Sequence, residues 1–393
     1  MKFSRRAAMQ ALGAAGLTPA LLSTACSQQV AEEARMPDLA AVKWPPAMGD
    51  DVPKICLGDG GDEARMRQYK QVGVDYVLGG GGRIPWTVES LRERMDRAEA
   101  SGIRVINLMI GGFNDVIHGG PKAAEQTQHV IESIRAAGQA GLPVIEYNFY
   151  AHRLTEGYYE EIGRAGAGYT AYDYDRLLDG KGRYDGPEDK GLKPRDLPPR
   201  EGIGTHTRAD QLKRAKAFLE AIVPEAEKAN VRLALHPNDP PVPISRGSEQ
   251  LFATFEHWKE YLDLVKSPYN GITYDCGVST ELGEDAPSVC RYLGERDVIN
   301  HVHFRNVVVR KPCIDYTEVF LDEGQCNMFA VMMELVRQKY SRGLYPEHPR
   351  ALDIDRQLSE LHGYPGGGGL VGFIYNVAYT KAMLQAALTL QRA

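Results

Sequence analysis

Short apolar runs alternate with longer amphipathic stretches along most of the chain. Eight runs have the length and the β-branched or apolar composition of buried strands. They cover residues 54–57, 74–78, 104–109, 143–148, 231–236, 271–275, 298–304 and 343–347. Helical periodicity fills the stretches between them, at 87–101, 121–140, 207–230, 258–265 and 324–340, and again at 369–392. Eight strand and helix units in this order predict an α/β fold, a (β/α)8 TIM barrel.

One connection is much longer than the others. About 80 residues separate the fourth predicted strand from the fifth, and residues 150–204 are rich in Gly, Tyr, Asp, Lys and Pro with weak periodicity. Long irregular insertions in compact domains are usually lids or binding loops. We expect a catalytic barrel domain over 51–393, with 150–204 covering its mouth as a lid; a mobile surface excursion is the alternative. The glycine runs at 79–82 and 366–369 lack phosphate-loop or dinucleotide spacing and are expected to form tight turns.

Composition narrows the class of partner. The 393 residues are 43% hydrophobic and 25% charged, which suits a folded globular chain. The net charge of −6 is spread without a basic block, which argues against nucleic acid and favours a small-molecule partner. Six cysteines without paired spacing predict neither a disulfide framework nor a structural zinc site.

The N-terminus has the pattern of an export signal. Two arginines, Arg5 and Arg6, precede an alanine-rich apolar run at 7–25 that is too short for a convincing membrane span. We interpret 1–26 as a signal of the twin-arginine type and 27–50 as a linker, which predicts a periplasmic protein. A lipid anchor on Cys26 is the only membrane contact that we expect. Whether Cys26 carries it stays open, because Leu22 stands one position too early for a lipoprotein processing site.

Polar residues with metal-binding side chains stand at the ends of the last four predicted strands. They are His236, Asp275, His303 and Glu347. Because the carboxyl ends of barrel strands meet at one mouth, two imidazoles and two carboxylates would form a site suited to Mn²⁺, with Fe²⁺, Co²⁺ or Zn²⁺ as competitors. The alternative is that each histidine is merely hydrogen-bonded. Strand alternation also puts Arg305 on the face of His303, as a candidate to hold a substrate carboxylate or to form a salt bridge inside the barrel.

These segments resemble the mannonate dehydratases, a family with a xylose-isomerase-like barrel, from about residue 44 to the C-terminus. The strongest motifs are His-Pro-Asn-Asp-Pro-Pro at 236–241, Ser-Pro-Tyr-Asn-Gly-Ile-Thr at 267–273, His-Phe-Arg-Asn-Val at 303–307, Tyr-Pro-Glu-His at 345–348 and Gly-Tyr at 363–364. Weaker support comes from Tyr-Asn-Phe at 147–149 and Pro-Trp-Thr at 85–87. The Trp-Arg-Thr-Asp stretch that follows Tyr-Asn-Phe in the family has no counterpart here.

The resemblance implies roles for individual residues. His236 and His303 match metal ligands, and His348 and Tyr364 match the acid and base groups, without an indication of which is which. Asp275 stands where the family has a cysteine, with Cys276 one residue beyond, and Glu347 stands where the family has aspartate; the choice between Asp275 and Cys276 stays open. Candidate substrate-binding residues from the same motifs are Arg305, Asn306, Tyr147 and Asn148.

The implied activity is that of a metal-dependent hydro-lyase, which dehydrates D-mannonate or a close sugar acid to a 2-keto-3-deoxy acid in hexuronate catabolism. The predicted export and the two changed ligands keep two alternatives open. One is a metal-dependent isomerase, epimerase or eliminating lyase on the same barrel, and the other is a non-catalytic sugar-binding lipoprotein. The sequence leaves a homo-oligomer possible without deciding it.

Overall fold

The computed structural model describes residues 43–361 and 363–392. The chain divides into a large compact unit, residues 47–391, and a small one made of residues 1–46 with 392 and 393. The predicted export signal, Cys26 and most of the predicted linker lie outside the described residues. Among the helices that are described, none combines the length and the apolar character needed to cross a membrane.

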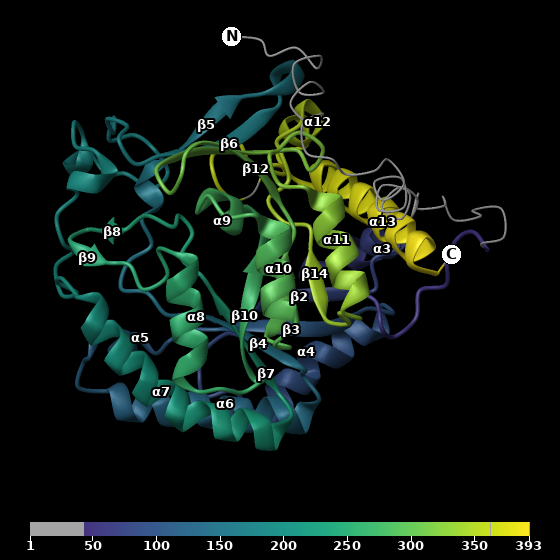
Figure 1. Cartoon of the computed structure of the whole chain (residues 1–393), viewed down its shortest axis with the longest axis horizontal. Coiled ribbons are helices and arrows are strands. Elements are labelled where there is room, and N and C mark those ends of the chain that lie inside the picture. Colours follow the sequence, from purple (N-terminus) through teal and green to yellow (C-terminus); the bar gives the residue numbers. More distant parts are fainter. Residues whose placement is uncertain (1–42, 362, 393) are drawn as a thin grey trace, which may run out of the picture. The chain divides into compact units, whose positions relative to one another are not determined.

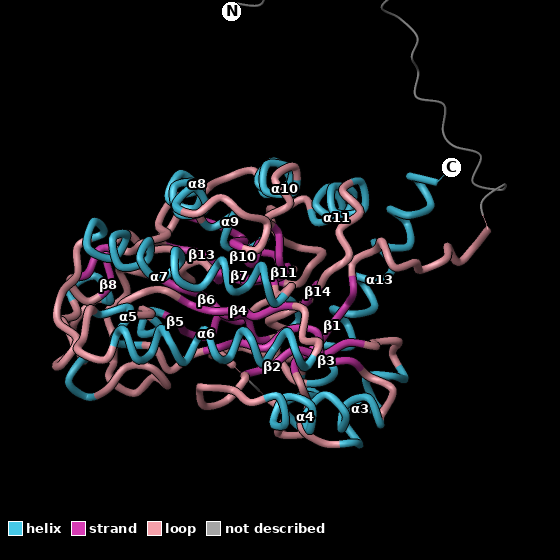
Figure 2. The backbone as a smooth tube through the Cα atoms, turned by 90° about the horizontal axis from the view of Figure 1, so that it is seen from below, coloured by secondary structure: helices cyan, strands magenta, loops and turns pink. Residues whose placement is uncertain are grey.

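Eight parallel strands close into a barrel in the order β1-β14-β11-β10-β7-β4-β3-β2, which confirms the predicted TIM barrel (Figures 1 and 2). All eight predicted strands are present, with ends that differ by no more than two residues. Their bounds are β1 (Lys54–Gly58), β2 (Tyr76–Gly80), β3 (Arg104–Ile110), β4 (Val144–Asn148), β7 (Arg232–His236), β10 (Asn270–Asp275), β11 (Ile299–His303) and β14 (Gly343–Tyr345).

Helices pack around this barrel, and their ends follow local capping chemistry. The longer helices are α3 (Glu63–Gln71), α4 (Val88–Ala100), α6 (Ala123–Ala140), α7 (Arg208–Ala229), α8 (Phe255–Leu264), α10 (Ala286–Gly294), α11 (Met328–Arg337) and α13 (Leu370–Arg392). Thr87 caps α4 in a capping box with Ser90, and Thr207 caps α7. Asn230 ends α7 in the left-handed region with φ 54°. Three shorter α-helices also occur among the described residues: α5 (Asn114–His118), α9 (Cys276–Glu281) and α12 (Asp353–Gln357).

A second sheet, antiparallel and four-stranded, was not predicted. Its order is β12-β13-β6-β5, with bounds β5 (Tyr158–Ile162), β6 (Gly168–Asp173), β12 (Asn306–Lys311) and β13 (Asp315–Val319). A small pair, β8 (Ile244–Ser245) with β9 (Ser248–Glu249), stands apart from it. The long insertion is therefore only partly irregular, because it supplies β5 and β6 to this sheet (Figure 1). Since β12 begins three residues after β11 ends, the second sheet starts at the carboxyl end of the barrel, where barrel enzymes keep their active sites.

The barrel interior is polar near that end. Along β4, Ile145 and Tyr147 belong to the hydrophobic core, while Glu146 between them accepts hydrogen bonds from Asn107 of β3 and Thr273 of β10. Strand alternation explains the division, because successive side chains point to opposite faces. The resulting lumen can hold charged groups that are shielded from water.

Candidate metal centre and active site

The four predicted metal ligands come together at the mouth of the barrel, and all four are buried. His236, Asp275 and His303 are the last residues of β7, β10 and β11, and Glu347 follows β14. The Nδ1 atom of His303 lies 3.2 Å from His236 Nε2 and 3.1 Å from Glu347 Oε1. Asp275 Oδ2 lies 3.9 Å from the same nitrogen. The arrangement of parallel strands thus converts four separate positions in the sequence into one cluster.

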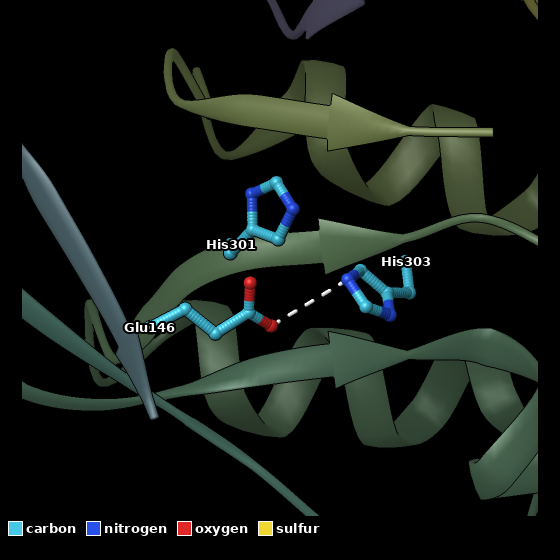
Figure 3. Close-up of side chains that lie close together, drawn as sticks. All are labelled: Glu146, His301 and His303. Atoms are coloured by element: carbon cyan, nitrogen blue, oxygen red, sulfur yellow. Dashed lines mark ion pairs between the residues drawn. The ribbon is translucent and has the colours of Figure 1, made fainter. Parts of the chain in front are cut away.

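Glu146 was not predicted and adds a third carboxylate to this cluster. Its Oε1 lies 3.5 Å from His303 Nε2, as the dashed line in Figure 3 marks. Two sets of candidate ligand atoms, each lying within 4.8 Å of one another, share His303: one with Glu146 and His301, the other with His236 and Asp275. The sequence did contain one signal for Glu146. Because side chains alternate along a strand, Glu146 lies on the same face as Asn148, which was predicted to bind substrate.

The charges of the cluster favour a cation. Burial disfavours a charged His303, but Glu347, Glu146 and Asp275 outweigh that effect and raise the pKa of His303 to about 9. Burial, with the neighbouring His303, lowers the pKa of His236 to about 3, so His236 stays neutral and free to ligate. Glu347 Oε1 lies within 3.2 Å of both His303 and Arg305. Two imidazoles and several buried carboxylates fit a divalent ion with nitrogen and oxygen ligands.

Asp275, and not Cys276, is the residue within reach of this cluster. Asp275 Oδ1 caps α9 by accepting the Val278 N–H at 2.9 Å, which leaves Oδ2 toward His303. Cys276 is buried in the hydrophobic core, where its thiol interacts with that of Cys326. The strand ends at Asp275, so the next side chain points away from the lumen.

Arg305 forms ion pairs inside the barrel. This was the alternative to its predicted contact with a substrate carboxylate. It is only 2% exposed, and its guanidinium lies 3.1 Å from Asp275 and 3.2 Å from Glu347. It also pairs with Asp239 at 3.3 Å, Glu281 at 2.5 Å and Glu318 at 3.7 Å. The expectation that Arg305 holds a substrate carboxylate is therefore corrected, because protein carboxylates surround this guanidinium and it does not line the cavity beside the cluster.

That cavity has a volume of about 440 Å³ and opens beside the candidate ligands. His236, His303, Glu347, His348, Asn148 and Tyr364 are among the residues that line it. Besides Arg305, two more of the predicted substrate-binding residues do not line it. Tyr147 points to the outer side of β4, where its hydroxyl lies 2.8 Å from that of Tyr261. Asn306 donates to the carbonyls of Leu321 and Cys326 and thereby fixes a loop.

The two predicted acid and base residues lie next to each other in the lining of this cavity. The His348 and Tyr364 rings are 5.2 Å apart. His348 Nδ1 lies 2.9 Å from Glu318 Oε2 of β13, and its Nε2 lies 3.5 Å from Glu347. Burial opposes protonation of His348, but Glu318 and Glu347 raise its pKa overall. Burial raises the pKa of Tyr364, so this phenol keeps its proton at neutral pH.

The insertion contributes part of the cavity wall. Tyr150, Arg153 and Thr170 line the cavity, and the Arg153 guanidinium lies 5.2 Å from the centre of the Tyr364 ring. Arg153 also donates to the Asp239 carbonyl at 2.7 Å. The insertion therefore shapes the site, while its movement as a lid stays a prediction.

Fold and site together define a class: a (β/α)8 barrel with a cluster of candidate metal ligands, two histidines and several carboxylates, beside a cavity at the carboxyl ends of its strands. The family model described as D-mannonate dehydratase (UxuA) matches residues 203–392. A mannonate dehydratase of Streptococcus pneumoniae (strain 70585) is 27% identical over 318 residues, which is 77% of this chain and 84% of that protein. The chain is thus similar to the mannonate dehydratases over most of its length, and the family model matches its C-terminal part.

Solved structures resemble the same barrel. The crystal structure of mannonate dehydratase from Streptococcus suis serotype2 has a TM-score of 0.71 and 24% identity, covering 86% of this chain and 93% of that one. A D-tagatose 3-epimerase-like protein has a TM-score of 0.52 and 13% identity, covering 85% and 98%. Dehydratases and an epimerase-like protein thus share this fold, so the fold does not by itself select the reaction.

Proposed function

We propose that the protein is a metal-dependent hydro-lyase that dehydrates a sugar acid, D-mannonate or a close analogue, to a 2-keto-3-deoxy acid. One observation carries the proposal: a buried cluster of two histidines and several carboxylates shares one cavity with His348 and Tyr364. The similarity of the chain to mannonate dehydratases supports it.

His236, Asp275, His303 and Glu347 would hold the metal, with Glu146 next to His303. Mn²⁺ fits this hard set of ligands best, and Fe²⁺, Co²⁺ and Zn²⁺ are competitors. When bound, the cation supplies Lewis-acid stabilisation of negative charge on the substrate carboxylate. The other requirements of dehydration, removal of one proton and delivery of another to the departing hydroxyl, fall to residues of the chain.

We assign the base to His348 and the acid to Tyr364. Glu318 holds Nδ1 of His348, so Nε2 is the atom that would take the proton beside the substrate carboxylate, and Glu318 stabilises the imidazolium that results. Tyr364 retains its proton because burial raises its pKa, so its hydroxyl can donate to the leaving oxygen. Asn148, the remaining predicted substrate-binding residue in the cavity, is positioned to contact substrate hydroxyls.

Mass spectrometry of the reaction tests this function. The protein lacking residues 1–26 is loaded with Mn²⁺, or with Co²⁺ or Zn²⁺ for comparison, and mixed with D-mannonate. We expect loss of one water, abolished by a chelator and reduced at least about 100-fold by His348→Ala. The matched control is His257→Ala, a histidine of α8 that does not line the cavity and should keep full activity.

The second candidate is an isomerase or epimerase, favoured by the carboxylates at positions 275 and 347 where the family has cysteine and aspartate. Conversion without a change of mass would support it and overturn the dehydratase assignment. Stoichiometric metal without turnover of any sugar acid would instead indicate the sugar-binding lipoprotein.

We also propose that the protein is exported to the periplasm by residues 1–26. The paired arginines and the short apolar run support this proposal. Fractionation of cells that express the full chain should place it in the periplasm, and Arg5→Lys with Arg6→Lys should retain it in the cytoplasm. Metabolic labelling with a fatty acid, compared with Cys26→Ser, tests the lipid anchor.

A further inference from the structure

A second cavity, of about 430 Å³, lies beside the one that holds the candidate metal ligands. The two cavities share Gly363, Tyr364 and Gly367 as lining residues, so they adjoin at this loop. Tyr158 lines the second cavity and packs on Tyr364, with the ring centres 4.5 Å apart. Nothing in the proposed dehydration of a single sugar acid uses this second space.

The second cavity carries positive charge that the protein does not pair. Arg176, Lys181 and Arg183 line it, and none of the three forms an ion pair with any other residue that the structure describes. Arg176 Nε is buried without a hydrogen-bond partner. Elsewhere in the insertion the pattern is the opposite, since Arg164 pairs with Asp322 and Arg195 with Asp175. Unpaired cations in a concave site favour an anionic ligand.

The acidic residues at this cavity offset only part of that charge. Glu160 is paired with Arg356, and Asp179, which accepts the backbone N–H of Lys181, leaves more cations than anions in the lining. Tyrosine side chains also line the cavity, and the Arg176 guanidinium lies 4.9 Å from the centre of the Tyr159 ring. Cationic groups beside aromatic side chains suit a polar ring that carries a carboxylate.

The loop between the cavities is held close to its neighbours. Gly366 has φ 76°, and a Cβ at this position would collide with the backbone of Tyr169. Arg183 donates a hydrogen bond to the Gly363 carbonyl and so connects the insertion to this loop. Only glycine fits at Gly366, and its close approach to Tyr169 holds the loop with Tyr364 at the border of both cavities.

We propose that the second cavity is an accessory subsite, and that the substrate class is a sugar acid extended by a further acidic sugar unit. The terminal sugar acid would lie in the first cavity, and the carboxylate of the attached uronic acid unit would meet Arg176, Lys181 and Arg183. This inference rests on the proposed function, because it assumes that the first cavity receives the sugar acid.

Calorimetric titration tests the subsite without relying on turnover. Three ligands are compared on the metal-loaded protein: D-mannonate, cellobionate, whose glucose unit is a neutral extension, and cellobionate with that glucose unit oxidised at C6 to glucuronate, an acidic extension. We expect the acidic disaccharide acid to bind at least about tenfold more tightly than the other two. Arg176→Gln with Arg183→Gln should remove that gain and leave D-mannonate binding unchanged.

Arg164→Gln is the matched control, because this arginine belongs to the insertion but is paired with Asp322 and does not line the cavity. It should leave the binding of all three ligands unchanged. Equal affinity for the neutral and acidic extensions, or no effect of the double variant, overturns the subsite. Absence of water loss from D-mannonate overturns the proposed function but leaves the binding comparison intact, so the two failures are distinguishable.

Discussion

Single residues at the strand ends carry the chemistry of this site, and their geometry decides which of them can act. His303 contacts His236, Glu347 and Glu146, so it is the centre of the cluster. Asp275 reaches the cluster through one oxygen because the other caps α9. Two predictions belong to this scale.

Metal binding should depend on pH through His303. The pKa of His303 is raised to about 9 in the metal-free protein, so below that pH it carries a proton that a metal must displace. The apparent affinity for Mn²⁺ should therefore rise between pH 6.5 and 8.5, by up to about tenfold per unit. Calorimetry in buffers of different ionisation enthalpy should detect proton release, and an affinity independent of pH over this range would contradict the prediction.

Substitution should show whether Asp275 or Cys276 is the metal ligand. Asp275→Asn removes the anionic ligand and should lower bound metal at least about tenfold. Cys276→Ala, one residue further along, changes only a buried apolar contact and should retain the metal. Metal content after dialysis, measured by inductively coupled plasma mass spectrometry, decides between them; retention by Asp275→Asn with loss by Cys276→Ala would reverse the assignment.

At the scale of elements, the second sheet brings groups to the barrel mouth that no barrel strand supplies. Glu318 of β13 holds both His348 and Arg350, the latter at 2.8 Å. The pairing of β13 with β6 connects this carboxylate to the insertion. The second sheet therefore positions the proposed base.

Glu318→Gln tests this positioning role. The amide cannot stabilise a charged imidazole, so we expect kcat to fall about 10- to 100-fold while KM and metal content change little. Glu161→Gln is a matched control, because Glu161 lies on β5 of the same sheet and pairs with Arg310 away from the cavity. An unchanged kcat in Glu318→Gln, or an equal loss in the control, would remove Glu318 from the mechanism.

At the scale of the whole barrel domain, Arg305 links separate elements through buried charge. Its partners lie on β10, on α9, on β13, after β7 and after β14. Removing one member of such a network leaves the other charges buried and unpaired, which is costly.

Arg305→Met should therefore destabilise the domain by about 3–5 kcal/mol in urea unfolding. The control is Arg291→Met, an arginine at the surface of α10 that pairs with Glu334 and should have little effect. Equal unfolding midpoints for Arg305→Met and the unchanged protein would show that the network does not stabilise the fold.

Much of this architecture was predictable because it depends on local pattern. Parallel strands are buried on both faces and are therefore rich in apolar residues, so the apolar runs predicted all eight barrel strands. The second sheet was missed because strands such as β5 and β12 carry exposed charged residues, including Glu160 and Arg310, and lack that signal. Glu146 was missed because alternation places it on the face of Asn148 but does not show that its side chain meets His303 of another strand.

The sequence by itself determined the order of strands and helices and the residue types at the strand ends, because periodicity and alternation are local properties. Tertiary structure alone decided which charges meet. Arg305 pairs with carboxylates, Tyr147 faces outward, and Asp275, unlike Cys276, lies beside the other candidate metal ligands, because each outcome depends on closure of the barrel. The second cavity likewise exists only because the insertion packs against the loop that contains Tyr364.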